Sequence, residues 1–451
     1  MIPVRPHQPT DRQQSQPSVT PLTEASAERH LAGICFKIGP PRLVGVEAEW
    51  FVHDDRCPEA PVDPARVAAA LAALPAHPDG PLLPAGSRLT EEPGGQVELS
   101  SPPAETLRAC AELLLTDQAA LRAACATQGL TLTGSGTDPL ARERRMQASH
   151  PRYLAMEQYF ERGGPWGRVM MTGTASVQVC VDSGTERQIA GRWRLTHLLG
   201  PVLVAAFANS PLLDGRPTGY RSTRQMVWSR MDASRTTAPA PDGDPRTAWA
   251  RYVLDAEVLC VRRPDGLPWT APAGLTFRDW LRGAGERPAT LADLEYHRTT
   301  LFPPVRPRGH LELRMIDAQP GEGWLVPLAL VGALLDDPRA ADAALEALDR
   351  LPDPGPDAAP RSALWQRAAS AGMSDPELRR AALACFAAAD RALARREEGG
   401  TGAGRDGDGR LRRALGEFAE RYPMRGRCPA DDQLDAVRAG ARPLPEEAPP
   451  C

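Results

Sequence analysis

The sequence predicts an α+β fold built on a mainly antiparallel sheet, and two observations lead to this class. Several segments alternate polar and apolar residues with a period of two, which is typical of strands that bury one face. The segments with helical periodicity do not alternate one for one with these strands, as a doubly wound parallel sheet would require. An antiparallel sheet flanked by helices is therefore favoured over a doubly wound fold.

The expected strands lie where the alternation is clearest, at residues 43–52, 96–100, 130–134, 174–182 and 310–317. The second strand follows the tight turn Pro93-Gly94-Gly95. Helices are expected at residues 65–74, 104–128, 152–161, 186–209, 324–335, 375–397 and 410–421. In the 104–128 segment, Leu107, Leu114 and Leu121 follow helical spacing, and Gly129 is suited to the end of a helix.

The domain organisation is expected to be simple. Residues 1–25 are rich in Pro, Gln, Ser and Thr, so we expect a disordered tail. Residues 26–397 are expected to form a single domain, whose C-terminal helical part begins at about residue 322. Residues 398–409 read EGGTGAGRDGDG, which predicts a flexible linker, and residues 410–451 are expected to form a short helix and a Pro-rich tail.

Composition excludes several classes of partner. The net charge of −4 over 451 residues gives no basic surface for nucleic acid or anionic membrane. The longest apolar runs, residues 198–208 and 324–335, are shorter than the roughly 20 residues of a membrane span. Nine dispersed cysteines without a CxxC pair indicate free thiols in a reducing compartment. No signal-peptide pattern is seen in the first 25 residues, so we expect a cytoplasmic protein.

Carboxylates recur on one face of the expected strands. Alternation places Glu47 and Glu49 on the same face, and Glu98 and Glu312 occupy the polar faces of two later strands. A solvated sheet face is the simplest explanation, but like charges side by side destabilise a sheet. Carboxylates about 6–7 Å apart along a strand can be bridged by bound cations. Oxygen ligands select hard cations, so the pattern predicts a site for magnesium or manganese.

Magnesium held by carboxylates is typical of phosphoryl transfer, which also needs fixed positive charge. Arginines are abundant in the second half of the chain, at positions 221, 224, 235, 306, 308 and 314. Alternation places Arg314 beside Glu312. The sequence has no P-loop, no GxGxxG after a strand and no Ser/His/Asp signature. Spacing alone thus indicates an enzyme that handles metal and phosphate.

One motif is distinctive enough to suggest a family. Residues 92–100 read EPGGQVELS, and eight further segments between about residues 40 and 335 follow in a consistent order. They include Gly45–Glu49, Phe207–Pro211, Arg221–Trp228 and Leu311–Arg314. Together these segments resemble the plant-type glutamate–cysteine ligases, relatives of glutamine synthetase. The resemblance extends to the bacterial branch that makes γ-glutamylcysteine for ergothioneine biosynthesis.

The resemblance implies a glutamine synthetase-like fold, in which a curved antiparallel sheet forms an open funnel flanked by helices. It also implies ATP-dependent ligation of L-glutamate to L-cysteine through an acyl phosphate, with Mg²⁺ or Mn²⁺ bound. Carried over residue by residue, the metal ligands would be Glu47, Glu49, Glu92, Glu98 and Glu312. Residues that bind substrate or phosphate would be Gln178, Asn209, Arg224, Trp228, Arg235 and Arg306. Glu47, Glu98 and Arg314 would be catalytic.

Two departures and three alternatives remain. The plant enzymes have Arg where this chain has Gly173, which removes a substrate clamp, and Asn where it has Cys180, which we interpret as a packing residue. His310 and His150 are further candidate ligands. The alternatives are a carboxylate–amine ligase with another amine acceptor, a metal-dependent hydrolase, and an inactive binding scaffold.

Overall fold

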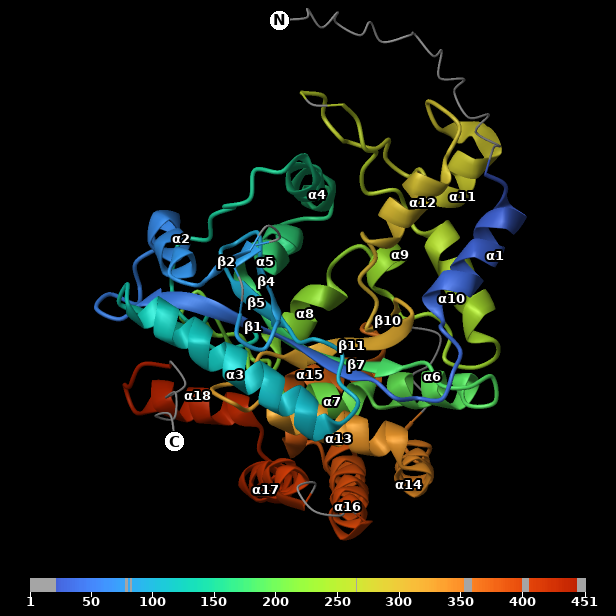
Figure 1. Cartoon of the computed structure of the whole chain (residues 1–451). Coiled ribbons are helices and arrows are strands. Elements are labelled where there is room, and N and C mark those ends of the chain that lie inside the picture. Colours follow the sequence, from blue (N-terminus) through green and yellow to red (C-terminus); the bar gives the residue numbers. More distant parts are fainter. Residues whose placement is uncertain are drawn as a thin grey trace, which may run out of the picture.

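An open antiparallel sheet organises the protein. The computed structural model describes residues 22–77, 80–81, 83–264, 266–352, 359–399 and 405–443. Its main sheet has seven strands in the order β10-β11-β7-β1-β5-β4, and β6 also pairs with β1 (Figure 1). The strands are β1 (Val44–Asp54), β4 (Arg88–Glu91), β5 (Val97–Ser100), β6 (Leu130–Thr133), β7 (Ser176–Asp182), β10 (Val305–Pro307) and β11 (His310–Asp317). All of its strand pairs are antiparallel, as predicted.

The central strand β1 separates an apolar face from a polar face. Val46, Ala48 and Trp50 are each 1% exposed and belong to the main core. Glu47 and Glu49 alternate with them and are partly exposed. The period-two pattern therefore fixes which side of the sheet packs against helices.

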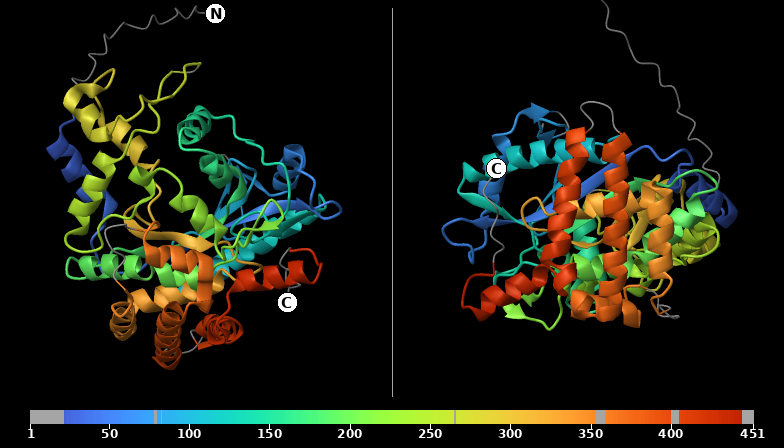
Figure 2. Two further views of the ribbon diagram at one scale, coloured as in Figure 1. Left: turned by 180° about the vertical axis from the view of Figure 1, so that it is seen from behind. Right: turned by 90° about the horizontal axis from the view of Figure 1, so that it is seen from below.

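Helices cover the apolar face in two layers (Figures 1 and 2). The inner layer contains α3 (Leu107–Ala126), α7 (Gly200–Ala206) and α13 (Leu325–Asp336), which contact β1, β11 and β7 respectively. The helices α14 (Pro338–Leu348), α16 (Pro376–Gly399) and α17 (Arg405–Arg421) pack outside them. Every residue of α13 except Asp336 is buried, because this helix lies between the sheet and α16. This explains its uninterrupted apolar sequence.

The polar face is walled by a different set of helices. They are α4 (Pro151–Glu161), α5 (Trp166–Gly173), α8 (Thr223–Ser229), α9 (Ala233–Thr236), α10 (Pro245–Asp255) and α12 (Leu291–Arg298). Figure 1 shows α4 and α5 on one side of this face and α9, α10 and α12 on the other. A smaller core that includes Met156, Met171 and Met226 joins α4, α5 and α8.

The remaining elements refine the predicted organisation. The helix α1 (Glu24–Cys35) begins inside the predicted N-terminal tail, of which residues 1–21 lie outside the described residues. The other short elements are α2 (Pro64–Ala72), α6 (Ile189–Leu198), α11 (Phe277–Asp279), α15 (Ala363–Ala371), α18 (Pro429–Arg438), β2 (Ala76–His77), β3 (Gly80–Pro81), β8 (Leu212–Leu213) and β9 (Arg216–Pro217). In the described part of the chain, no helix has the length and apolar character needed to cross a membrane.

Three predicted segments differ from the structure. The single helix predicted at 186–209 is two helices, α6 and α7, and Pro201 stands in the first turn of α7, where its missing N–H is tolerated. Most of the predicted linker 398–409 is helical, because α16 continues to Gly399 and α17 begins at Arg405, while residues 400–404 lie outside the described residues. The helix α18 follows where a Pro-rich tail was expected.

Candidate active site

A cavity of about 530 Å³ opens on the polar face of the sheet. Its walls come from β1, β4, β5, β7, β10 and β11 and from α4, α5, α8 and α12. Charged residues dominate its lining, which contains five glutamates (47, 49, 91, 92 and 98) and seven arginines (88, 152, 224, 298, 306, 308 and 314). Such a cavity is built to bind ligands that carry both anionic and cationic groups.

The carboxylates gather where β1 meets β5. Glu49 lies directly opposite Glu98 across the two strands, and Glu47 follows two residues away on the same face. Glu49 accepts hydrogen bonds from the backbone N–H of Ser176 at 2.9 Å and from Gln178 Nε2 at 3.0 Å. These contacts fix the Glu49 side chain against β7.

Two more carboxylates of the cluster are held beside the tight turn. Glu98 accepts hydrogen bonds from Thr90 Oγ1 at 3.0 Å and Ser100 Oγ at 3.1 Å. Glu92 precedes the turn, and its backbone N–H donates to the carbonyl of Gln96 at 2.8 Å. At Gly94 a Cβ atom would lie 2.5 Å from Thr172 Cα, so only glycine lets the turn approach α5 so closely.

Burial and mutual repulsion disfavour the charged forms of these groups. Burial, together with Glu312 and Glu98, raises the pKa of Glu47 to about 8. Burial, together with Glu49 and Glu98, also raises the pKa of Glu92 to about 8. Burial is likewise the largest cause that raises the pKa of Glu49 and Glu98. A cation among these carboxylates would restore their charged forms.

The donor chemistry fits a hard divalent cation, because every candidate ligand offers carboxylate oxygen. Glu47, Glu49, Glu92 and Glu98 all line the cavity. Within the described residues, no three His, Cys, Asp or Glu side chains are already arranged as a metal site.

Glu312 has a different environment from the one that its strand position predicts. It is fully buried and does not line the cavity. Arg306 Nε and Nη2 donate to its two carboxylate oxygens at 2.7 and 3.0 Å, and Arg314 Nη1 donates at 2.8 Å. Although burial works to raise it, the pKa of Glu312 is held below its usual range by Arg306 and Arg314. In this structure both carboxylate oxygens of Glu312 are therefore bonded to arginines, and its predicted role as a metal ligand stays a prediction.

The arginines form the opposite side of the cavity. Arg306 on β10 lies opposite Glu312 on β11. Arg314, also on β11, donates to Gln178 Oε1. Arg224 on α8 donates from Nη2 to the carbonyl of Arg314 at 2.9 Å and lies 5.9 Å from the ring centre of Trp228. Positive charge from α8, β10 and β11 thus faces the carboxylates of β1 and β5.

Two residues that are predicted to bind substrate lie outside the cavity lining. Asn209 is 1% exposed, and its Nδ2 donates to the carbonyls of Gly134 and Ala318. Arg235 is fully buried, and it donates to Asp232 and to the carbonyls of Thr300 and Glu257. Neither side chain lines the cavity. Both are predicted to bind substrate, and in this structure their side-chain N–H groups donate to other groups of the protein.

Comparison with known proteins shows the family. Residues 43–447 match the profile of glutamate–cysteine ligase family 2. The chain belongs to this family. The glutamate–cysteine ligase EgtA of Mycolicibacterium smegmatis is 42% identical over 431 residues, covering 93% of each chain. The EgtA of Mycobacterium tuberculosis is 39% identical over 439 residues, covering 94% of this chain and 93% of the relative.

Two other matches are weaker in coverage or in identity. The chloroplastic glutamate–cysteine ligase of Medicago truncatula is 36% identical over 258 residues, covering 54% of this chain and 50% of the relative. A solved glutamate–cysteine ligase from Francisella tularensis in complex with AMP is 13% identical, with a TM-score of 0.44, and covers 90% of this chain and 87% of that chain. The family predicted from the EPGGQ motif, and with it the prediction of a ligase, is confirmed by the profile and the EgtA relatives.

Several residues that line the cavity are not predicted from the sequence. Arg152 of α4 and Arg298 of α12 face the cavity from helices, and Arg152 donates to Thr299 Oγ1 and to the carbonyl of Thr299, each at 2.8 Å. Their arginine type was visible in the sequence, but helical segments gave no alternation to place them. Arg88 could have been found, because β4 pairs with β5 and places Arg88 opposite Ser100.

The two candidate histidines do not line the cavity. His150 caps α4 by accepting a hydrogen bond from Arg152 N at 3.1 Å, and His310 lies opposite Asp182 on β7. At Gly173, a Cβ atom would lie 2.9 Å from Arg144 Cδ. Glycine at this position therefore makes room for Arg144, which pairs with Asp214.

Proposed function

We propose that this protein joins the side-chain carboxylate of L-glutamate to the amine of L-cysteine, converting ATP to ADP and phosphate. The product would be γ-glutamylcysteine, made for ergothioneine biosynthesis. The supporting observation is one cavity, in a member of glutamate–cysteine ligase family 2, where a glutamate cluster faces an arginine cluster. The EgtA relatives carry the name of the same activity.

The first step would be attack by the glutamate carboxylate on the γ-phosphorus of ATP. A P–O bond forms to the substrate oxygen, and ADP leaves with the electron pair of the broken bond. Negative charge then spreads over the phosphoryl oxygens, and fixed positive charge lowers the barrier. Arg306, Arg308 and Arg314 lie together on β10, β11 and the turn between them, where they would bind these oxygens.

The second step would be attack by the cysteine amine on the carbonyl carbon of the acyl phosphate. A C–N bond forms, the C–O bond to phosphate breaks, and the amine proton passes to a carboxylate in the cavity. No covalent bond to the protein is needed, which agrees with the absence of a nucleophile motif in the sequence. Arg224, with Trp228 beside it, would hold a carboxylate of L-glutamate, and Gln178 would line the floor of the cavity.

Glu47, Glu49, Glu92 and Glu98 would hold Mg²⁺, or Mn²⁺ in its place, which when bound neutralises phosphate charge. Glu312 would act on the other side, by keeping Arg306 and Arg314 extended toward the phosphates. The two kinds of glutamate on one sheet face thus have separate tasks. One kind would bind the cation, and the other fixes arginines.

The decisive experiment identifies the product made from ATP, Mg²⁺, L-glutamate and L-cysteine by mass spectrometry. We expect γ-glutamylcysteine, with ADP formed only when both amino acids are present. Glutamate labelled with ¹⁸O in its side-chain carboxylate should transfer one labelled oxygen to the released phosphate, as an acyl phosphate requires. ATP turnover indifferent to both amino acids would indicate a hydrolase, and no turnover would indicate a binding scaffold.

Two further arms define the acceptor and the pathway. Replacing cysteine with other amino acids should lower kcat/KM, and a better acceptor than cysteine would reassign the amine substrate. In the source organism, deleting the gene should deplete ergothioneine, and supplied γ-glutamylcysteine should restore it. Unchanged ergothioneine after deletion would contradict the pathway assignment.

A further inference from the structure

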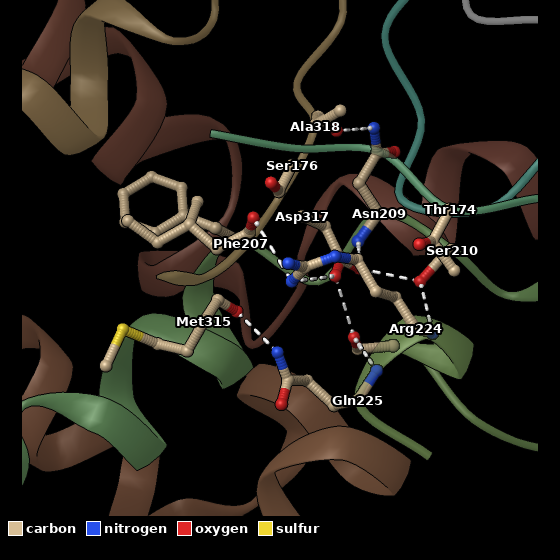
Figure 3. Close-up of polar contacts among 12 residues, drawn as sticks. Thr174, Ser176, Phe207, Asn209, Ser210, Arg224, Gln225, Met315, Asp317 and Ala318 are labelled. Atoms are coloured by element: carbon tan, nitrogen blue, oxygen red, sulfur yellow. Dashed lines mark hydrogen bonds and ion pairs between the residues drawn. The ribbon is translucent and has the colours of Figure 1, made fainter. Parts of the chain in front are cut away.

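A buried carboxylate lies directly behind the cavity wall. Asp317 ends β11, is 1% exposed and does not line the cavity. Its Oδ2 accepts hydrogen bonds from Asn209 N at 3.0 Å and Ser210 Oγ at 2.6 Å. Its Oδ1 accepts one from Ser222 Oγ at 2.9 Å and lies 3.8 Å from Arg224 Nη1. Figure 3 shows Asp317 between Ser210, Asn209 and Arg224.

Three of these contacts lead to Arg224, the buried arginine that lines the cavity. Ser210 Oγ, which donates to Asp317, accepts from the backbone N–H of Arg224 at 3.2 Å. Ser222 caps α8 by accepting from Gln225 N at 3.2 Å, and Arg224 is in the first turn of that helix. The same carboxylate therefore contacts the start of α8, the Arg224 backbone through one hydroxyl, and the guanidinium directly.

Neighbouring groups pack closely around the Asp317 carboxylate. A Cβ atom on Gly136 would lie 2.5 Å from Asp317 Cγ, so the adjacent backbone is in close contact. Asn209, which donates to Asp317, is itself held by Gln433 of α18, whose Nε2 donates to Asn209 Oδ1 at 2.7 Å. Packing from β11, the Asn209 turn and α18 converges here, and rigid support of this kind fixes a functional side chain.

Asp317 and Arg224 each favour the charged form of the other. Burial works against the charged form of Arg224, while Asp317 and Glu49 favour it. Burial also raises the pKa of Asp317, and Arg224 opposes that rise. An arginine buried without such a partner would be costly in free energy, so Asp317 makes a cationic Arg224 possible at the cavity wall.

We propose that Asp317 is a positioning residue for ligation: it holds the Arg224 guanidinium in the orientation that binds a carboxylate of L-glutamate. This inference rests on the proposed function, in which Arg224 binds that carboxylate. Asp317 itself touches no substrate. Its contribution passes entirely through Arg224.

The variant Asp317→Asn isolates the charge. An Asn oxygen in the Oδ2 position would still accept from Asn209 N and Ser210 Oγ, and its NH₂ could donate to Ser222 Oγ. The negative charge facing Arg224 is lost, and the hydrogen bond with Ser222 reverses its direction. We expect the KM for glutamate to rise about 10- to 100-fold, with much smaller changes in the KM values for cysteine and ATP. Equal changes in all three KM values, or none, would overturn the proposal.

A double-mutant cycle separates positioning from general stability. Arg224→Lys removes the forked guanidinium, so Asp317→Asn added to it should change kcat/KM for glutamate by less than about twofold. Multiplicative losses would show that Asp317 acts independently of Arg224. The matched control is Asp293→Asn, because Asp293 is also buried and paired, with Arg287 at 2.6 Å, yet neither residue lines the cavity. It should lower stability and leave all three KM values unchanged.

A second variant keeps the test decisive if Asp317→Asn does not fold. Ser210→Ala removes the hydroxyl that links Asp317 to the Arg224 backbone, without changing buried charge. A several-fold rise in the KM for glutamate alone supports the proposal, and an unchanged value contradicts it. Failure of the proposed function would be seen separately, as absence of γ-glutamylcysteine from the wild-type protein. In that case calorimetric binding of L-glutamate to wild type and variants reports on Asp317.

Discussion

Glu49 on β1 lies directly opposite Glu98 on β5, with both side chains on the cavity face of the sheet. Like charges in directly opposed positions destabilise an antiparallel pair. Hydrogen bonds to Ser176, Thr90 and Ser100 hold the two side chains in place but do not neutralise them. Such a repulsive strand pair is expected where a bound cation neutralises the two carboxylates.

Replacing one of these carboxylates should therefore separate stability from activity. Glu98→Gln keeps an oxygen that can accept from Thr90 and Ser100 and removes one like charge. We expect the metal-free variant to be at least as stable as wild type, by up to about 1 kcal/mol in urea unfolding. Ligation should fall by about 100-fold or more, and Mg²⁺ should raise the melting temperature less than in wild type. A fully active variant would show that Glu98 is not part of the catalytic site.

The opposite effect on stability is expected when Glu312 is replaced. Glu312→Gln leaves the partly exposed Arg306 and Arg314 without their fully buried charge partner. Removing one member of a buried ion pair typically costs about 3–5 kcal/mol, so the variant should unfold at markedly lower urea concentration. The contrast with Glu98→Gln is the test, because a shared metal-ligand role would make the two variants alike. Similar stability changes in both would contradict the separate tasks assigned here.

The sheet and its polar face could be predicted because strand alternation is a local property. Glu47, Glu49 and Glu98 fall on the predicted face since each strand repeats every two residues. The same rule placed Glu312 on that face correctly but could not show that Arg306 from β10 would cover it. The pairing of β10 with β11, which period-two alternation does not specify, decides whether Glu312 lines the cavity or lies beneath the Arg306 side chain.

Residues outside the sheet were harder to place. Arg235 and Asn209 belong to the family motifs, yet each is consumed by buried hydrogen bonds that only tertiary packing creates. Arg152 and Arg298 reach the cavity from helices whose orientation depends on the smaller core around Met156. The sequence predicts which residue types the chemistry needs, and tertiary packing determines which individual residues of each type reach the cavity.

Cys180 should be dispensable. It lies opposite Gly45 and Glu312 on the polar face, and burial, together with Glu47 and Glu312, raises the pKa of its thiol well above the usual value. A thiol kept protonated in this way is a poor nucleophile. We expect Cys180→Ala to retain kcat/KM within about threefold and to lose about 1–2 kcal/mol of stability. Complete loss of ligation in a folded variant would assign the thiol a direct role.

The pH dependence of stability should reveal a buried neutral histidine on α12. His297 is 2% exposed, donates through Nε2 to the carbonyl of Val253 at 2.9 Å and stacks on Phe277. Burial, followed by the charge of Arg235, lowers its pKa to about 3. In the unfolded chain His297 binds a proton near pH 6.5, whereas in the folded protein it stays neutral at that pH. The free energy of unfolding is therefore highest above pH 6.5 and falls as the solution is acidified.

The His297→Gln variant measures this contribution. Its amide can still donate to Val253 but does not titrate. Between pH 6 and pH 5, the unfolding free energy of wild type should fall by about 1 kcal/mol more than that of the variant, because other titrating groups are common to both. Urea unfolding at the two pH values gives both slopes. Equal changes in the unfolding free energy of the two proteins would mean that His297 is already protonated in the folded protein. A charged imidazolium would then donate the hydrogen bond to Val253.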